Sequence, residues 1–269
     1  MAVPLFATSL DRYMPRLTET LGEVIRGGSY ILGPQVSSFE REFAAYLGTE
    51  HCVGVANGTD AITIALRALG VEPGDEVVCP SFTFYATVEA TVNAGATPVY
   101  CDIDPETFCV TAETVRAAIT PRTKAIVPVH LFGNVAPVPE LRELGLPVLE
   151  DSAQAAGATL HGKRAGALGH AATFSFFPSK NLPCLGDGGA IVTDDDDVAR
   201  RARRLRFHGS EDKTTFLELG YNSRLDELQA AALRILLPEL DGWNAARRAA
   251  AAAYERAGLG DHVSLPVPV

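Results

Sequence analysis

Short apolar segments alternate with helix-like segments over residues 50–193, and this alternation restricts the possible folds more than any other feature of the sequence. The stretches between the apolar runs repeat apolar residues at a helical spacing, and Gly or Pro marks nearly every junction. Strands separated by single helices cannot form hairpins, so they are expected to pair in parallel through right-handed crossovers, with helices on both faces of an α/β sheet. The apolar runs are residues 51–56, 76–80, 97–102, 124–130, 147–151, 171–177 and 190–193.

Beyond residue 193 the pattern becomes helical. Helices are expected at residues 198–206, 224–236 and 239–256. The first of these is rich in arginine and follows four aspartates, at residues 194–197. Acidic residues at the start of a helix and basic residues toward its end both suit the helix macrodipole. This charge pattern is therefore interpreted as stabilisation of a helix and not as a nucleic-acid site.

Charge and cysteine content exclude several classes of protein. The chain has 33 acidic and 23 basic residues, and its net charge of -10 disfavours binding to nucleic acid or to an anionic membrane. No apolar run approaches the length of about 18 residues that a membrane span needs, and the first residues lack the features of a signal peptide. The five cysteines form no CxxC pair, as expected for free thiols in a cytoplasmic protein without a disulfide framework or metal site.

One short motif, NGTD at residues 57–60, is suited to holding a phosphate. Gly58 allows close approach of the backbone, the free N–H groups at the start of the following helix can bind one phosphate, and Thr59 can add its hydroxyl. An ordinary helix N-cap without a ligand is the alternative. The sequence contains neither GxxxxGK[ST] nor GxGxxG, which argues against a P-loop or a dinucleotide site.

A carboxylate and an amine each follow an apolar segment. Asp151 ends the segment at 147–151, where ligands bind in open parallel sheets, and a buried carboxylate there needs a cationic partner. Lys180 follows the apolar residues 173–177, and partial burial would lower the pKa of its amine, as a Schiff-base lysine requires. The alternatives are a helix N-cap for Asp151 and a solvated surface position for Lys180. The other three lysines lie in turns that look solvated.

Together these features match the requirements of pyridoxal 5'-phosphate (PLP). This cofactor needs a phosphate site, a carboxylate that keeps the pyridine nitrogen protonated and a lysine that carries the aldehyde. The aromatic residues of SFTFY at 81–85 can cover a face of the ring. Metal hydrolases and Ser-His-Asp hydrolases are disfavoured, because the sequence contains neither HExxH nor GxSxG.

Eight motifs occur in one order along nearly the whole chain. They are SYILGP at 29–34, VANGTD at 55–60, PSFTFYAT at 80–87, PVHLFG at 128–133, EDSAQ at 150–154, SFFPSK at 175–180, GDGG at 186–189 and GYNSRL at 220–225. On these motifs the chain resembles the DegT/DnrJ/EryC1/StrS family of PLP-dependent aminotransferases. The resemblance implies fold type I, a three-layer α/β/α architecture with a mainly parallel sheet of seven strands.

The resemblance also implies an activity. Members of this family transfer an amino group, here expected to come from L-glutamate, to a nucleotide-linked keto sugar by ping-pong cycling between PLP and pyridoxamine phosphate (PMP). The active sites are expected to be shared between the two subunits of a homodimer. The alternatives are a catalytically impaired or regulatory PLP-binding homologue and a PLP- or PMP-dependent sugar dehydratase. Those dehydratases carry a histidine at the position of Lys180, which argues against the second alternative.

Residue roles follow from the resemblance position by position. Lys180 matches the Schiff-base lysine, which moves the proton between Cα and C4', and Asp151 matches the partner of the pyridine nitrogen. His130 lies in one of the motifs, and a packing role is predicted for it. The remaining cofactor-binding residues implied are Gln154 near the ring 3-hydroxyl, Gly58, Thr59 and Ser175 at the phosphate, Phe84 (or its neighbour Tyr85) stacked on the ring, and Asn222 at the phosphate of the neighbouring subunit.

The chain departs from the family pattern at two places. Asp187 stands where the family more often has Glu, a minor change in a loop. Family members continue into a small C-terminal domain, of which only the first helix is expected here, so the sequence is interpreted as a fragment or a natural truncation. The predicted organisation is an N-terminal arm and dimer contact over residues 1–35, a PLP-binding domain over 36–237 and the lead-in helix of the C-terminal domain over 238–269.

Overall fold

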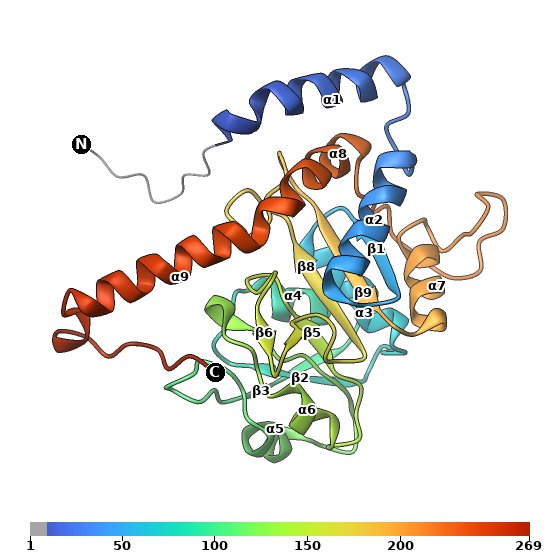
Figure 1. Cartoon of the computed structure of the whole chain (residues 1–269). Coiled ribbons are helices and arrows are strands. Elements are labelled where there is room, and N and C mark those ends of the chain that lie inside the picture. The colour runs from blue at the N-terminus through green and yellow to red at the C-terminus, as the bar shows by residue number, and fades with distance from the viewer. Residues whose placement is uncertain (1–9) are drawn as a thin grey trace.

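A twisted sheet with helices on both faces forms the centre of the molecule. The computed structural model describes residues 10–269, so the first nine residues of the arm predicted over residues 1–35 lie outside the described part (Figure 1). The strands are β1 (His51–Val55), β2 (Glu76–Pro80), β3 (Thr97–Cys101), β4 (Thr123–Ile126), β5 (Leu149–Asp151), β6 (Thr159–Leu160), β7 (Lys163–Arg164), β8 (Ala171–Ser175) and β9 (Gly189–Thr193).

The main sheet is mostly parallel, as predicted. Two ladders, β1-β9-β8-β5 and β3-β2-β4, are joined by isolated parallel bridges from Ile126 to Val148 and from Val129 to Asp151. Within the ladders, β2 is parallel to β3 and β4, and β5 is parallel to β8. The resulting order is β1-β9-β8-β5-β4-β2-β3, which confirms a sheet of seven strands. β6 and β7 form a separate small hairpin.

Strand β9 runs antiparallel to both of its neighbours, β1 and β8, so the expectation of parallel pairing is wrong for this strand. Residues 176–188, which connect β8 to β9, contain no helix. The chain therefore returns beside β8 without the crossover that a parallel pair requires. As a consequence, β9 begins at the edge of the sheet where β1 and β8 end.

Each of the three helices predicted after residue 193 is present, and the largest shift is the start of the helix predicted at 224–236, which begins at Glu227. Within residues 10–269, no helix has the length and apolar character needed to cross a membrane. The α-helices are α1 (Met14–Gly27), α2 (Pro34–Leu47), α3 (Gly58–Ala68), α4 (Ala86–Asn93), α5 (Ala112–Ala118), α6 (Val138–Arg142), α7 (Asp196–Leu205), α8 (Glu227–Leu236) and α9 (Leu240–Arg256). The 3-10 helices are η1 (Asp11–Tyr13), η2 (Leu131–Gly133), η3 (Leu237–Glu239) and η4 (Leu259–Asp261).

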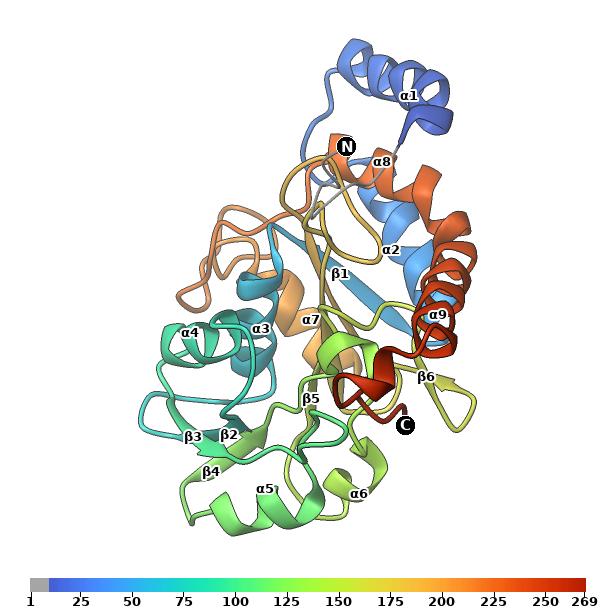
Figure 2. The same ribbon diagram turned by 90° about the vertical axis from the view of Figure 1, so that its left-hand side faces the viewer.

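The strands β1, β2, β5, β8 and β9 are buried on both faces because their side chains alternate between two apolar layers. In β9, Ala190 and Val192 belong to the layer formed with α2 and α8, whereas Ile191 belongs to the layer formed with α3. Figure 2 shows α2 and α9 on one side of β1 and α3 on the other. In the first layer the rings of Phe43 and Phe174 pack edge to face, with their centroids 5.0 Å apart. This two-sided packing positions the ends of the strands.

Candidate active site

The ends of several strands meet at one edge of the sheet. Val55 at the end of β1 pairs with Gly189 at the start of β9, and Gly189 also pairs with Ser175 at the end of β8. Asp151 ends β5, which pairs in parallel with β8. Strand-end residues of three predicted motifs are therefore neighbours at the edge where open α/β sheets bind ligands.

Gly58 and Ser175 pack closely together at this edge. Gly58 is the first residue of α3, and a Cβ atom there would lie 2.7 Å from the Cβ of Ser175. Asn57 caps the helix, because its side chain accepts a hydrogen bond of 2.8 Å from the Asp60 N–H. The N-cap alternative is thus present as a local structure. It leaves the first N–H groups of α3, together with the Thr59 hydroxyl, as donors suited to a phosphate.

Asp151 is a buried carboxylate with two hydrogen-bond donors. Its Oδ2 accepts from the Thr87 hydroxyl at 2.9 Å, and its Oδ1 accepts from the Ala153 N–H at 3.2 Å. Burial raises the pKa of Asp151, while both hydrogen bonds and the positive charge of Lys180 act in the opposite direction. No helix starts after Asp151 in this segment, so the N-cap alternative does not apply here.

Thr87 is a site residue that the sequence reasoning missed. It lies in the first turn of α4, is buried, and holds the Asp151 carboxylate from a separate element. Its own hydroxyl also lies 2.9 Å from that of Thr83. Thr87 is part of the motif at residues 80–87, but a threonine in a motif does not reveal which distant group it contacts.

Lys180 lies in the irregular connection between β8 and β9. Its N–H donates a hydrogen bond of 2.8 Å to the Phe177 carbonyl, and its side chain is partly buried. Burial lowers the pKa of the Lys180 amine, and the nearby Asp151 carboxylate opposes this effect. The amine and the carboxylate thus interact electrostatically, although neither forms an ion pair within the described chain.

Gln154 and the aromatic motif lie close in the chain to Asp151 and to its partner Thr87, respectively. Gln154 lies three residues after Asp151 in the chain. Its Oε1 accepts a hydrogen bond of 2.8 Å from the Phe132 N–H in η2. Phe84 and Tyr85 immediately precede α4, the helix that holds Asp151 through its first turn. Both rings are largely exposed, at 69% and 70%, so either can cover a bound ring and the one-residue ambiguity stays open.

Asn222 lies in the connection between α7 and α8. It is exposed, and its backbone pairs with Phe207. It lines a cavity of about 350 Å³, which is also lined by a residue near the start of α3 and by one of the GDGG motif. Its predicted contact is with another subunit. The other residues lining the cavity are Ala56, Asp187, Arg224, Asp226 and Gln229.

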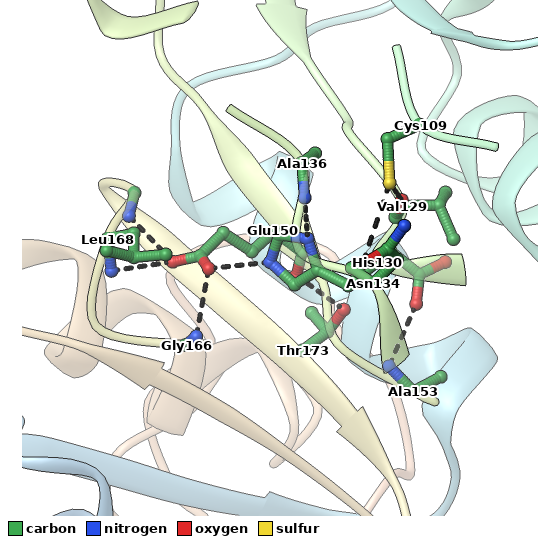
Figure 3. Close-up of polar contacts among 12 residues, drawn as sticks. Cys109, Val129, His130, Asn134, Ala136, Glu150, Ala153, Gly166, Leu168 and Thr173 are labelled. Carbon is green, nitrogen blue, oxygen red and sulfur yellow. Dashed lines mark hydrogen bonds and ion pairs between the residues drawn. The ribbon is translucent and has the colours of Figure 1, made fainter. Parts of the chain in front are cut away.

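His130 occupies a fully buried packing position beside Asp151, in line with the role predicted for it. Its Nδ1 accepts from the Ala136 N–H at 3.1 Å, so Nε2 carries the proton and donates to Glu150 at 2.8 Å. Its backbone N–H donates to the Asp151 carbonyl at 3.0 Å. Figure 3 shows Glu150 between His130 and the loop after β7. The other donors to Glu150 are the N–H groups of Gly166 (2.9 Å), Leu168 (2.9 Å) and Gly169 (2.6 Å).

The Glu150 carboxylate is expected to stabilise the fold in a pH-dependent way. Burial raises its pKa, but the His130 and backbone hydrogen bonds outweigh burial and hold the pKa below its usual value of 4.5. We expect Glu150→Gln to lower the free energy of unfolding by about 2–4 kcal/mol at pH 7, because an amide cannot accept from four donors. Chemical denaturation measures this difference.

The sign of the pH dependence follows from the lowered pKa of Glu150. Its stabilisation is complete above the pKa of the unfolded chain and is lost as pH falls through the lower pKa of the folded protein. The difference in the free energy of unfolding between wild type and Glu150→Gln should therefore become smaller as the pH falls. Glu143→Gln, at an exposed carboxylate, serves as the control and should change stability by less than about 0.5 kcal/mol. A gap that widens in acid contradicts a charged Glu150.

Comparisons with known proteins agree on one family. The sequence model of the DegT/DnrJ/EryC1/StrS aminotransferase family matches residues 13–265. A protein of Geobacillus stearothermophilus named "Pleiotropic regulatory protein" is 48% identical over 278 residues, covering 100% of this chain and 75% of that protein. The dTDP-3-amino-3,4,6-trideoxy-alpha-D-glucose transaminase of Streptomyces venezuelae is 49% identical, covering 93% of this chain and 66% of that enzyme.

A solved structure matches at the level of the fold. The crystal structure of S. venezuelae DesV in complex with a ketimine intermediate superposes with a TM-score of 0.92 at 47% identity. The match covers 97% of this chain and 71% of that one. The chain thus spans about two thirds to three quarters of the length of these relatives.

Proposed function

The chain belongs to the DegT/DnrJ/EryC1/StrS aminotransferase family, and its structural neighbours are PLP-dependent aminotransferases. We propose that it transfers an amino group from L-glutamate to a nucleotide-linked keto sugar. One observation carries the proposal. The buried Asp151 ends β5 beside β8, the last residue of β8 (Ser175) packs tightly on Gly58, and the partly buried Lys180 follows in the next connection.

The donor set of the site fits PLP. Gly58 packs so closely on Ser175 that no side chain is tolerated at the start of α3, which keeps the N–H groups there accessible to a phosphate. Asp151 is a buried carboxylate suited to a protonated pyridine nitrogen, and Lys180 would bind the aldehyde carbon. When bound, PLP supplies an electron sink for the negative charge that develops beside the transferred amino group. Thr59, Ser175, Gln154 and Phe84 would complete the cofactor site.

Lys180 would move the protons of the reaction at its Nζ atom. Burial lowers the pKa of this amine, so a larger fraction is neutral near pH 7 than for an exposed lysine, and only the neutral form acts as nucleophile or base. Asp151, held by Thr87 and Ala153, would orient the cofactor and keep its nitrogen protonated. The other lysines are exposed, so none offers a comparable base.

The proposal includes a homodimer in a reducing compartment. Asn222 is exposed and would reach the phosphate site of the second subunit, and the exposed rings of Phe84 and Tyr85 lie beside the same active site. All five cysteines are free and buried in the structure, which suits the cytoplasm. A regulatory PLP-binding protein is the second candidate, because one relative at 48% identity carries a regulatory name.

A direct assay distinguishes these functions. The full chain is incubated with PLP, L-glutamate and a panel of dTDP- and UDP-linked 3-keto and 4-keto sugars, and mass spectrometry follows 2-oxoglutarate and the amino sugar. Formation of both products in equal amounts supports the aminotransferase. Binding of PLP at Lys180, trapped with borohydride, without turnover of any sugar supports the regulatory candidate. Absence of PLP binding at Lys180 contradicts both.

A further inference from the structure

Helix α9 places one polar side chain in a buried position, that of Asn244. Leu240 and Asn244 are the buried residues of α9, and the helix extends from the sheet with its later residues mostly exposed (Figure 1). The Asn244 Oδ1 accepts a hydrogen bond of 2.9 Å from Asn181 Nδ2, and its Nδ2 donates one of 2.8 Å to the Ala156 carbonyl. Both ends of the amide are therefore used, as expected for a buried polar group.

The two partners of Asn244 belong to the two segments that build the active site. Asn181 directly follows Lys180, and Ala156 lies in the loop that follows Asp151 and contains Gln154. The Asn244 side chain thus connects the segment that carries Lys180 to the loop that follows Asp151. Asn244 is 63 residues from Asn181 and 88 residues from Ala156 in the sequence.

The contact region around Asn244 is tightly packed. Gly157 has a φ angle of +87°, and a Cβ atom there would lie 2.6 Å from the Asn244 Nδ2 and 2.7 Å from the Tyr46 hydroxyl. Any larger residue at position 157 would push the amide away from Ala156. The glycine is therefore required for this contact, both by its backbone conformation and by the lack of space.

Helix α9 is itself held in place one turn before Asn244. Asp241 forms two hydrogen bonds of 3.1 Å with Arg164, and the Tyr46 hydroxyl donates to the same carboxylate at 2.5 Å. The Arg164 guanidinium also stacks on the Tyr46 ring at 3.9 Å. These contacts connect the start of α9, one turn before Asn244, to α2 and to β7.

The connection that carries Lys180 is anchored in the apolar core just after the lysine, where Leu182 and Cys184 are buried. Residues 176–188 contain neither helix nor strand, so no regular ladder holds them. The Cys184 N–H also donates to the Phe176 carbonyl at 2.7 Å, and the Leu185 N–H donates to Gln229 at 2.7 Å. Asn181 makes the side-chain contact next to the reactive lysine.

We propose that Asn244 is a positioning residue that fixes the Lys180 segment relative to the Asp151 loop. The proposal rests on the role assigned to Lys180 in the proposed function. Replacing Asn244 by leucine removes both hydrogen bonds and leaves the Asn181 amide and the Ala156 carbonyl without partners. Residues 177–181, which precede the buried Leu182, then lose their side-chain contact with α9, and we expect the Lys180 side chain to become more exposed to water.

The test uses the cofactor-free full chain, so its result does not depend on any activity. Acetic anhydride is added in competition with a reference amine over a range of pH, and mass spectrometry reports the titration profile of each lysine. Lys124, Lys163 and Lys213 are exposed and serve as internal references. For Asn244→Leu we expect the Lys180 profile to move to higher pH, which lowers the neutral fraction at pH 8 about threefold, with the references unchanged.

Matched variants separate positioning from general packing. Asn181→Ala removes the same hydrogen bond from the other side and leaves α9 intact, so it should shift the Lys180 profile even if Asn244→Leu fails to fold. Arg247→Met removes the long hydrogen bond of 3.5 Å that the exposed Arg247 donates to the same Asn244 Oδ1, but keeps the contacts with Asn181 and Ala156, so it should leave the profile unchanged. A wild-type Lys180 profile in Asn181→Ala, or in a folded Asn244→Leu with a lowered Tm, overturns the proposal.

Failure of the Asn244 proposal can be distinguished from failure of the proposed function. If no keto sugar is aminated but the Lys180 profile moves in both asparagine variants, Asn244 positions the lysine of a protein with another role. If amination occurs and the profile does not move, the aminotransferase stands without the Asn244 support.

Discussion

Replacement of Lys180 by alanine should lower kcat/KM for amino transfer by about 10⁴-fold or more, because it removes the positioned base at the site. Burial lowers the pKa of this amine and so supplies its neutral form near pH 7, and no exposed lysine reproduces that environment. Steady-state production of 2-oxoglutarate from L-glutamate in the presence of the keto sugar measures the loss. Borohydride should fix PLP on the wild type at Lys180 and should not fix it there in the variant.

Lys163→Ala is the matched control, because Lys163 is an exposed lysine in the hairpin of β6 and β7. It should keep activity within about twofold of wild type and leave the borohydride labelling unchanged. The Lys180 variant should keep the wild-type circular dichroism spectrum, since only a partly buried side chain is shortened. Retention of more than about one tenth of wild-type kcat/KM by Lys180→Ala is incompatible with its role as the base.

Asp151→Asn is expected to lower kcat/KM by about 10²- to 10³-fold, because a neutral amide cannot keep the pyridine nitrogen of the cofactor protonated. The substitution preserves the shape of the side chain, and its oxygen can still accept from Thr87. Loss of activity with retained PLP binding therefore reports charge rather than packing. Equilibrium dialysis of PLP beside the kinetic assay separates the two. Activity within about threefold of wild type contradicts the assigned role.

Thr87→Val offers a milder change at the same carboxylate, with a defined pH signature. The Thr87 hydroxyl lowers the pKa of Asp151, which burial raises, so its removal should raise that pKa further. The acid limb of the kcat/KM profile, where Asp151 becomes protonated, should consequently move to higher pH, while the rate near neutral pH falls less than in Asp151→Asn. If the acid limb of the Thr87→Val profile stays at the wild-type pH, protonation of Asp151 is not the cause of that limb.

The local features of the site could be predicted from the sequence because each depends on neighbouring residues. The apolar segments correspond to strands, since a buried strand needs apolar residues on both faces. Asp151 ends such a strand, and Gly58 begins a helix behind a capping Asn57. Lys180 follows the last residues of β8. These positions are set by periodicity, by turn residues and by caps.

The direction of β9 and the partners of the site residues depend on the tertiary structure. β9 is antiparallel because the connection before it forms no helix, and the apolar pattern of a strand is the same in either direction. Thr87 reaches Asp151 across 64 residues, and Asn181 reaches Asn244 across 63. A polar residue in the sequence shows which donors and acceptors it carries, but the partner is determined only when packing of the apolar layers brings distant segments together.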